Sequence, residues 1–245
     1  MGPKILYLIQ GELLRLNKYR VTLVSFLVAL IWGLALYFID DMDILSRLLP
    51  LIIQMEVTMM SIIFIGSILF FEKSEQTIST LLVTPISTGE QIWSKVIANT
   101  IHLLFSSVLI LLVFYFIKEV EVHFIWMLFG LILSLVFHSL LGYVFSYHSK
   151  DFTSMLLGVM MFIILLSIPS LLHQFDLAFK GEVWRYILLI TPAQASIELI
   201  TFGFTGKFVL ATLVSYMVLI SLTVALYFGY VKRAYKTYAI KQGGI

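Results

Sequence analysis

Six long apolar stretches run through this sequence, and they limit its possible folds more than any other feature. Each is close to the roughly 20 residues that a helix needs to cross the hydrocarbon core of a bilayer. A lone strand would leave its backbone groups unpaired in lipid, so each stretch is predicted to be a helix. The predicted spans are residues 21–39, 48–71, 97–117, 124–147, 152–172 and 207–230.

The composition agrees with a membrane protein and excludes a soluble one. Hydrophobic residues make up 60% of the 245 positions and charged residues only 12%, which is about half the charged share of a soluble domain. The sequence therefore predicts an all-α, polytopic membrane protein whose six transmembrane helices form a single transmembrane domain, residues 1–245. The formal net charge is +2 and no basic run is present, so no nucleic-acid partner is expected.

The sequence carries no residue pattern of an enzyme or of a metal site. It has no cysteine, which excludes disulfides and thiolate ligands. His102 and His138 have no Asp or Glu at ligand spacing, and the Gly206-Lys207 pair lacks the spacing of a phosphate-binding loop. We therefore expect no metal, no cofactor and no catalytic site in this chain, and any driving energy must come from another chain.

Basic residues near the span ends predict the orientation in the membrane. One side holds 11 of them, namely Lys4, Arg15, Lys18, Arg20, Lys73, Lys95, Lys150, Lys232, Arg233, Lys236 and Lys241. The opposite side holds 5, namely Arg47, Lys118, Lys180, Arg185 and Lys207. Because basic residues stay on the inner side, both termini are predicted to be cytoplasmic.

Residues 1–20 show the pattern of an amphipathic helix. Apolar residues recur at helical spacing while the charges fall mostly elsewhere, and the apolar positions are Ile5, Leu8, Ile9, Leu13 and Leu16. This pattern favours a helix that lies in the cytoplasmic interface of the membrane. The alternative is a simple N-terminal extension of the first span.

The longest cytoplasmic loop, residues 72–96, combines charges with a compact apolar group. A short helix is predicted to end at Thr84-Pro85, because the residue before proline avoids the helical region, and it presents Ile78, Leu81 and Leu82 on one face. Ser87 and Glu90 have the spacing of a capping box, which predicts that a new helix begins there and runs into the third span. The apolar group either docks on a cytoplasmic partner or packs back on the span ends and lipid.

On the outer side, residues 173–206 form the longest connection. Thr191 is a predicted N-cap, Pro192 occupies the first helical position, and Gly203 lies just past the predicted end, which delimits a helix over residues 193–202. Its apolar residues predict that this helix dips into the outer leaflet or covers a path through the protein.

Glu56 is the one acidic residue inside a predicted span. It lies about 12 Å into the bilayer at 1.5 Å per residue, where a carboxylate costs roughly 2.5 to 3.5 kcal/mol. It is therefore expected to face protein or water, or to be protonated. Its role is either that of a cation or proton site in a pathway or that of a hydrogen-bonded structural residue at an interface.

Three short stretches resemble the type 2 class of ABC exporter permeases. The run from Phe71 through Glu72-Lys73-Ser74-Glu75 and Thr84-Pro85-Ile86-Ser87, with Glu90 and Lys95 after it, looks like the loop between their second and third spans. Gly11-Glu12-Leu13-Leu14-Arg15 looks like their N-terminal elbow helix, and Thr191-Pro192 resembles the start of their extracellular gate helix. Gln76 departs from the glycine usual in the family. The finer match is to bacterial fluoroquinolone or multidrug export permeases.

The resemblance implies that the cytoplasmic loop couples this chain to a separate ABC ATPase subunit, which would hold ATP and Mg. The positions implied to carry the coupling are Glu75, Thr77, Ile78, Leu81, Leu82, Pro85, Glu90 and Lys95. It also implies a second permease copy or a homologue, a bacterial plasma membrane, and export of a hydrophobic or amphipathic substrate. Peptide, lipid-linked polymer or haem export, or a membrane enzyme or channel outside this class, remain alternatives.

Overall fold

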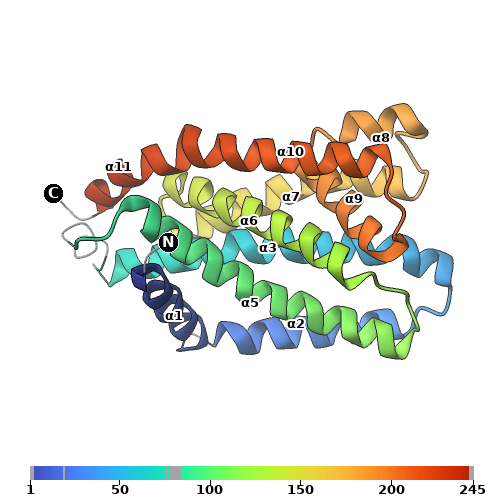
Figure 1. Cartoon of the computed structure of the whole chain (residues 1–245), viewed down its shortest axis with the longest axis horizontal. Coiled ribbons are helices and arrows are strands. Elements are labelled where there is room, and N and C mark those ends of the chain that lie inside the picture. Colours follow the sequence, from blue (N-terminus) through green and yellow to red (C-terminus); the bar gives the residue numbers. More distant parts are fainter. Residues whose placement is uncertain (1–2, 19, 76, 78–83, 243–245) are drawn as a thin grey trace.

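The computed structural model describes residues 3–18, 20–75, 77 and 84–242, which form an elongated bundle of helices (Figure 1). The elements are α1 (Pro3–Lys18), α2 (Val21–Tyr37), α3 (Met42–Ser74), α5 (Thr88–Ile117), α6 (Phe124–His148), α7 (Phe152–Gln174), α8 (Glu182–Leu188), α9 (Pro192–Thr205), α10 (Leu210–Leu226), the π-helix η1 (Tyr227–Val231) and α11 (Lys232–Gln242). Helices α1 and α11 lie at one end of the bundle and α8 and α9 at the other (Figure 1).

The prediction of an all-α polytopic membrane protein is confirmed for the described residues. Helices α3, α5, α6 and α7 are each long and apolar enough to cross a membrane, and α10 forms a fifth such helix with η1 and α11, over Leu210–Ala239. Helices α8 and α9 meet at a bend of 116° and pass the same test only when they are taken together as one broken span.

Helix α2 is shorter than the predicted first span, residues 21–39. It has 17 residues, which corresponds to about 25 Å at 1.5 Å per residue. Its side chains are largely exposed, including Leu27, Ile31 and Leu34. This apolar surface suits contact with lipid, although the helix alone does not reach the usual length of a span.

The centre of the bundle is α3, which packs against α5, α6, α7 and α9. Its closest neighbour is α6, and glycine makes the approach possible. A Cβ atom added at Gly142 of α6 would lie 2.8 Å from Ile65 Cβ and 3.0 Å from the carbonyl oxygen of Ile62. Small residues at such crossings let membrane helices pack backbone against backbone.

Side-chain caps fix where two of the long helices begin. The predicted capping box is confirmed, because Ser87 Oγ accepts from the backbone N–H of Glu90 and the Glu90 carboxylate accepts from the backbone N–H of Ser87. At the start of α7, Asp151 accepts a 2.7 Å hydrogen bond from the backbone N–H of Ser154. That hydrogen bond lowers the pKa of the exposed Asp151 carboxyl.

Helix α9 begins where the sequence predicts and ends later. Thr191 Oγ1 accepts from the backbone N–H of Gln194 at 3.2 Å, and Pro192 occupies the first helical position. The predicted end at Gly203 is wrong, because the left-handed residue that ends the helix is Gly206, with φ of 64°. Gly203 lies inside the helix, where a Cβ atom would come within 2.8 Å of Met127, so it serves close packing.

Helix α1 has the amphipathic character that its sequence predicts. Ile5 and Leu16 are buried against the bundle, where α1 packs mainly on α5. Leu6 and Leu14 are about two-thirds exposed, at 68% and 64%. A helix with one apolar side on the protein and a second apolar side exposed is suited to lie in a membrane interface.

Candidate coupling site

Four charged side chains from three helices meet at the α1/α11 end of the bundle. Lys95 Nζ of α5 donates to Glu12 Oε1 of α1 at 2.7 Å and lies 2.8 Å from Glu72 Oε1 of α3. Arg15 Nη1 of α1 donates to the same Glu72 oxygen at 2.7 Å and lies 3.4 Å from Glu12 Oε2. We call these four residues the ion cluster.

The ion cluster is withdrawn from solvent and its charges balance. The side chains of Lys95 and Glu72 are only 3% and 1% exposed, and those of Glu12 and Arg15 are 10% and 27% exposed. Two cations face two carboxylates, so none of the buried charges lacks an opposite charge. A buried charge that loses its partner is costly, and the cluster therefore resists separation of α1, α3 and α5.

The ion cluster sits at the point where the predicted coupling loop leaves and rejoins the bundle. Glu72 lies two residues before the end of α3, and Lys95 lies seven residues after the start of α5 at Thr88. The chain between these helices, which contains the predicted coupling helix, is thus anchored on both sides by charges that also hold α1.

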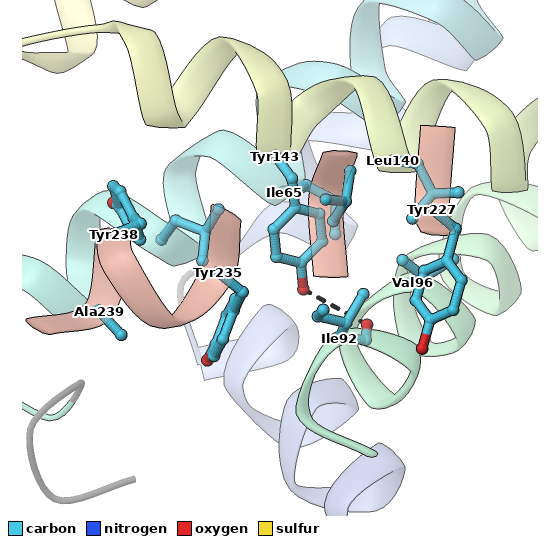
Figure 2. Packing of buried hydrophobic residues seen from close by; sticks show 11 residues of the cluster. Ile65, Ile92, Val96, Leu140, Tyr143, Tyr227, Tyr235, Tyr238 and Ala239 are labelled. Carbon is cyan, nitrogen blue, oxygen red and sulfur yellow. Dashed lines mark hydrogen bonds between the residues drawn. The ribbon is translucent and has the colours of Figure 1, made fainter. Parts of the chain in front are cut away.

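A layer of aromatic and aliphatic side chains from α3, α5, α6, η1 and α11 packs at this end of the bundle (Figure 2). Tyr143 of α6 points toward α5 and donates from Oη to the carbonyl oxygen of Ile92 at 3.3 Å. Tyr235 of α11 donates to Gln91 Oε1 at 2.8 Å. Buried tyrosines usually keep a partner for the hydroxyl, and these two bonds tie α6 and α11 to the first turns of α5.

The structure describes only some of the residues that are predicted to carry the coupling. Thr77 Oγ1 donates to the carbonyl oxygen of Glu72 at 3.3 Å, and Glu75 forms the C-cap of α3. Pro85 is exposed, and Glu90 closes the capping box of α5. Ile78, Leu81 and Leu82 lie outside the described residues.

Lys95 is buried and does not lie on the surface that a partner could contact. The resemblance implied that Lys95 contributes to coupling, and the structure buries its side chain within the ion cluster. Any contribution to coupling must therefore act through Glu12 and Glu72. Sequence reasoning did not identify these two acids or Arg15 as its partners, because 83 positions separate Lys95 from Glu12.

A cleft of about 510 Å³ opens beside the start of α5, where the predicted coupling loop rejoins the bundle. It is lined by Ser87 and Gly89 at the start of α5 and by Lys232 and Lys236 of α11, among others. Two lysines and no acidic residue occur among its described lining residues. This part of the α1/α11 end offers a concave and positively charged surface to a partner.

At the opposite end, a charged pair fixes the predicted gate helix. Arg185 of α8 donates through Nε and Nη2 to both carboxylate oxygens of Glu198 of α9. The Glu198 side chain is 8% exposed, and two-pronged pairs of this kind are among the strongest in proteins. Thr191 and Pro192 thus begin a helix that is held to α8 and buried against α6 and α10.

Glu56 lies inside the bundle, as its sequence position predicts. It is 6% exposed and accepts a 3.1 Å hydrogen bond from Ser106 Oγ of α5 through Oε1. Its other oxygen, Oε2, is buried and has no hydrogen-bond partner among the described residues.

Comparison with known proteins identifies the family of the chain. No curated protein matches the sequence significantly. A family model described as ABC-2 type transporter matches residues 4–205, which cover α1 to α9 and therefore both the ion cluster and α9. The fold and this match together establish that the chain belongs to the ABC-2 type transporter family, whose members are membrane permease components of ABC transporters.

Proposed function

We propose that this chain is the permease subunit of an ABC exporter that moves a hydrophobic or amphipathic substrate, such as a drug, out of the cell. A separate ATPase subunit binds ATP and Mg and docks on the α1/α11 end, which faces the cytoplasm of a bacterial plasma membrane. The chain between α3 and α5 forms the coupling helix. The observation that carries the proposal is the ion cluster, which anchors both ends of that segment to α1.

The ion cluster explains how movement would pass from the ATPase to the membrane. A force on the segment between Glu72 and Lys95 acts on α3 and α5 together, because these helices share Lys95 and its carboxylate partners. Helix α1 moves with them through Glu12 and Arg15. The lysines of the cleft beside Ser87 suit acidic side chains on the ATPase.

A second copy of the chain completes the transporter in this proposal. Helix α7 presents a broad apolar face that packs on nothing in the described chain, with Met161 and Leu165 exposed to 67% and 70%. Two such faces opposite each other would line a path between the copies. The proposed arrangement is a homodimer with one ATPase on each permease.

The coupling proposal is tested with the double variant Leu81→Asp/Leu82→Asp. The two substitutions remove the burial of two leucine side chains on docking, and each such burial contributes about 2 kcal/mol to binding. We expect loss of ATPase binding and loss of permease-stimulated ATP hydrolysis, with normal insertion into the membrane. The measurements are copurification with a coexpressed ABC ATPase and ATP hydrolysis in proteoliposomes.

The matched control changes two exposed apolar residues at the other end, as Leu177→Asp/Ile190→Asp. Both side chains are strongly exposed, at 67% and 74%. The control is expected to bind and stimulate the ATPase normally. Stimulation at the wild-type level by the Leu81→Asp/Leu82→Asp variant would refute the proposed coupling helix.

A further inference from the structure

A lateral groove runs along the bundle between α2 and α5. One cavity of about 330 Å³ is lined by Asn17, Leu23, Phe26, His102, Phe105, Ser106 and Leu109. A second, of about 380 Å³, is lined mainly by α2 and also by Leu109 and Val113 of α5. Phe26 and Leu109 line both cavities, so the two adjoin and form one groove. Each part is within the size range of small-molecule sites, about 300 to 1,000 Å³.

The two parts of the groove differ in polarity. The second cavity is lined by apolar and aromatic side chains, with Tyr37 at its far end. The first contains Asn17, His102 and Ser106 beside Phe26 and Phe105. None of the described lining residues of either cavity is Lys, Arg, Asp or Glu. The groove therefore suits a molecule with a long apolar part and one polar group.

A carboxylate lies directly behind the polar part of the groove. Ser106 lines the first cavity and donates from Oγ to Glu56 Oε1 at 3.1 Å. The hydroxyl oxygen of Ser106 keeps lone pairs for a donor in the groove. A donor at a normal distance of about 2.9 Å from Ser106 Oγ would lie within about 6 Å of Glu56 Oε1, which is close enough for a buried charge to act strongly.

Glu56 itself lacks a balancing partner on the described chain. It is only 6% exposed, and its Oε2 accepts no hydrogen bond from any described residue. A carboxylate in such a position is stabilised by a cation nearby. Phe26 and Phe105 line the same cavity, and aromatic rings attract cations.

We propose that this groove binds lipophilic amine cations, with the ammonium group at Ser106 in front of Glu56 and the apolar part along α2 and Leu109. The inference rests on the proposed export function and names its substrate class. The groove would admit such molecules from the membrane, because α2 and its side chains Phe26 and Leu30 are exposed on the outside of the bundle.

The test compares two probes of equal length, 4-phenylbutylamine, which is a cation at neutral pH, and 4-phenylbutan-1-ol, which is neutral. Binding of each radiolabelled probe is measured by equilibrium dialysis with the full-length permease alone in lipid nanodiscs, and binding to empty nanodiscs is subtracted. Without the ATPase, the experiment reports on the groove whether or not the coupling proposal holds.

We expect the amine to bind about tenfold more tightly than the alcohol, since the two differ by the charge that faces Glu56. Glu56→Gln should reduce amine binding about tenfold and leave alcohol binding within about twofold. The matched control Glu119→Gln, at an exposed position outside the spans, should change neither. Ser106→Ala, which removes the hydroxyl and keeps the charge of Glu56, should weaken amine binding and spare the alcohol.

Several outcomes would overturn the proposal. Equal binding of the two probes would mean that the groove binds any apolar chain and does not select cations. Unchanged amine binding in both Glu56→Gln and Ser106→Ala would mean that the amine binds elsewhere. A further variant, Leu109→Trp, keeps both Glu56 and Ser106 and adds bulk at a residue that lines both cavities. It should reduce binding of both probes, and wild-type binding by this variant would exclude the groove.

Discussion

Replacement of Lys95 with methionine tests the ion cluster most directly. Methionine keeps an unbranched side chain and removes the charge, which leaves Glu12 and Glu72 to share Arg15 alone. Loss of one partner from a buried ion pair costs about 3 to 5 kcal/mol. Arg15 still lies 2.7 Å from Glu72 and 3.4 Å from Glu12, so the lower value applies. About 3 kcal/mol corresponds to more than a 100-fold change in the unfolding equilibrium.

The assay is unfolding of the purified protein in mixed micelles at rising SDS, followed by tryptophan fluorescence. Lys18→Met is the matched control, because Lys18 is exposed on α1, and its effect should stay within about 0.5 kcal/mol. Addition of Glu72→Gln to Lys95→Met restores charge balance and should recover part of the loss. A loss below about 1 kcal/mol for Lys95→Met, or a strictly additive double variant, would refute the view that the cluster acts as one buried unit.

Three further predictions concern other parts of the fold. Gly142→Val should cost about 1 to 3 kcal/mol in SDS unfolding through overpacking at the α3–α6 crossing, whereas Gly11→Ala, which meets no atom within 4 Å, should be neutral or stabilising. Because the pKa of Asp151 is lowered in the fold, its contribution to stability is complete above the unfolded pKa of about 3.9 and is lost as the pH falls through the folded value. Asp151→Ala should therefore destabilise at pH 7, and its difference from the wild type should shrink as the pH falls below about 3.9. Arg185→Met, which leaves the buried Glu198 unpaired, should speed limited proteolysis between residues 176 and 206, and an unchanged cleavage rate would contradict the role of this pair.

The spans that could be predicted are those whose ends carry a local signal. Helix α6 covers Phe124–His148, close to the predicted 124–147, because polar residues stop the apolar run on both sides. The start of α5 at Thr88 follows from the capping box of Ser87 and Glu90. At the other extreme, the last helix continues through α11 to Gln242, well past residue 230. The predicted span ends at residue 230 because charged residues follow it, yet Tyr235 and Tyr238 lie among those charges and pack into the bundle.

The candidate site could be predicted only in part from the sequence, because its chemistry depends on contacts between residues far apart in the chain. The depth of Glu56 follows from its distance along an apolar run, but its partner Ser106 is 50 positions away and nothing local marks it. Resemblance to a family singled out Lys95, and only the packing of α1 against α5 reveals that Glu12 meets it. Helical periodicity reports which face is apolar and does not report which charges meet.

The π-helix η1 has a consequence for how the last helix fits the bundle. Buried residues recur at every fourth position along it: Ala211, Ser215, Leu219, Thr223, Tyr227, Val231, Tyr235 and Ala239. On a regular α-helix each step of four residues overshoots a full turn by about 40°, so such a row would wind off its neighbours. A π turn absorbs about one extra residue and rotates the row back by about 100°. The wide turn thus works as a register correction, and a one-residue deletion there would swing the tyrosines of α11 out of the bundle without touching any of them.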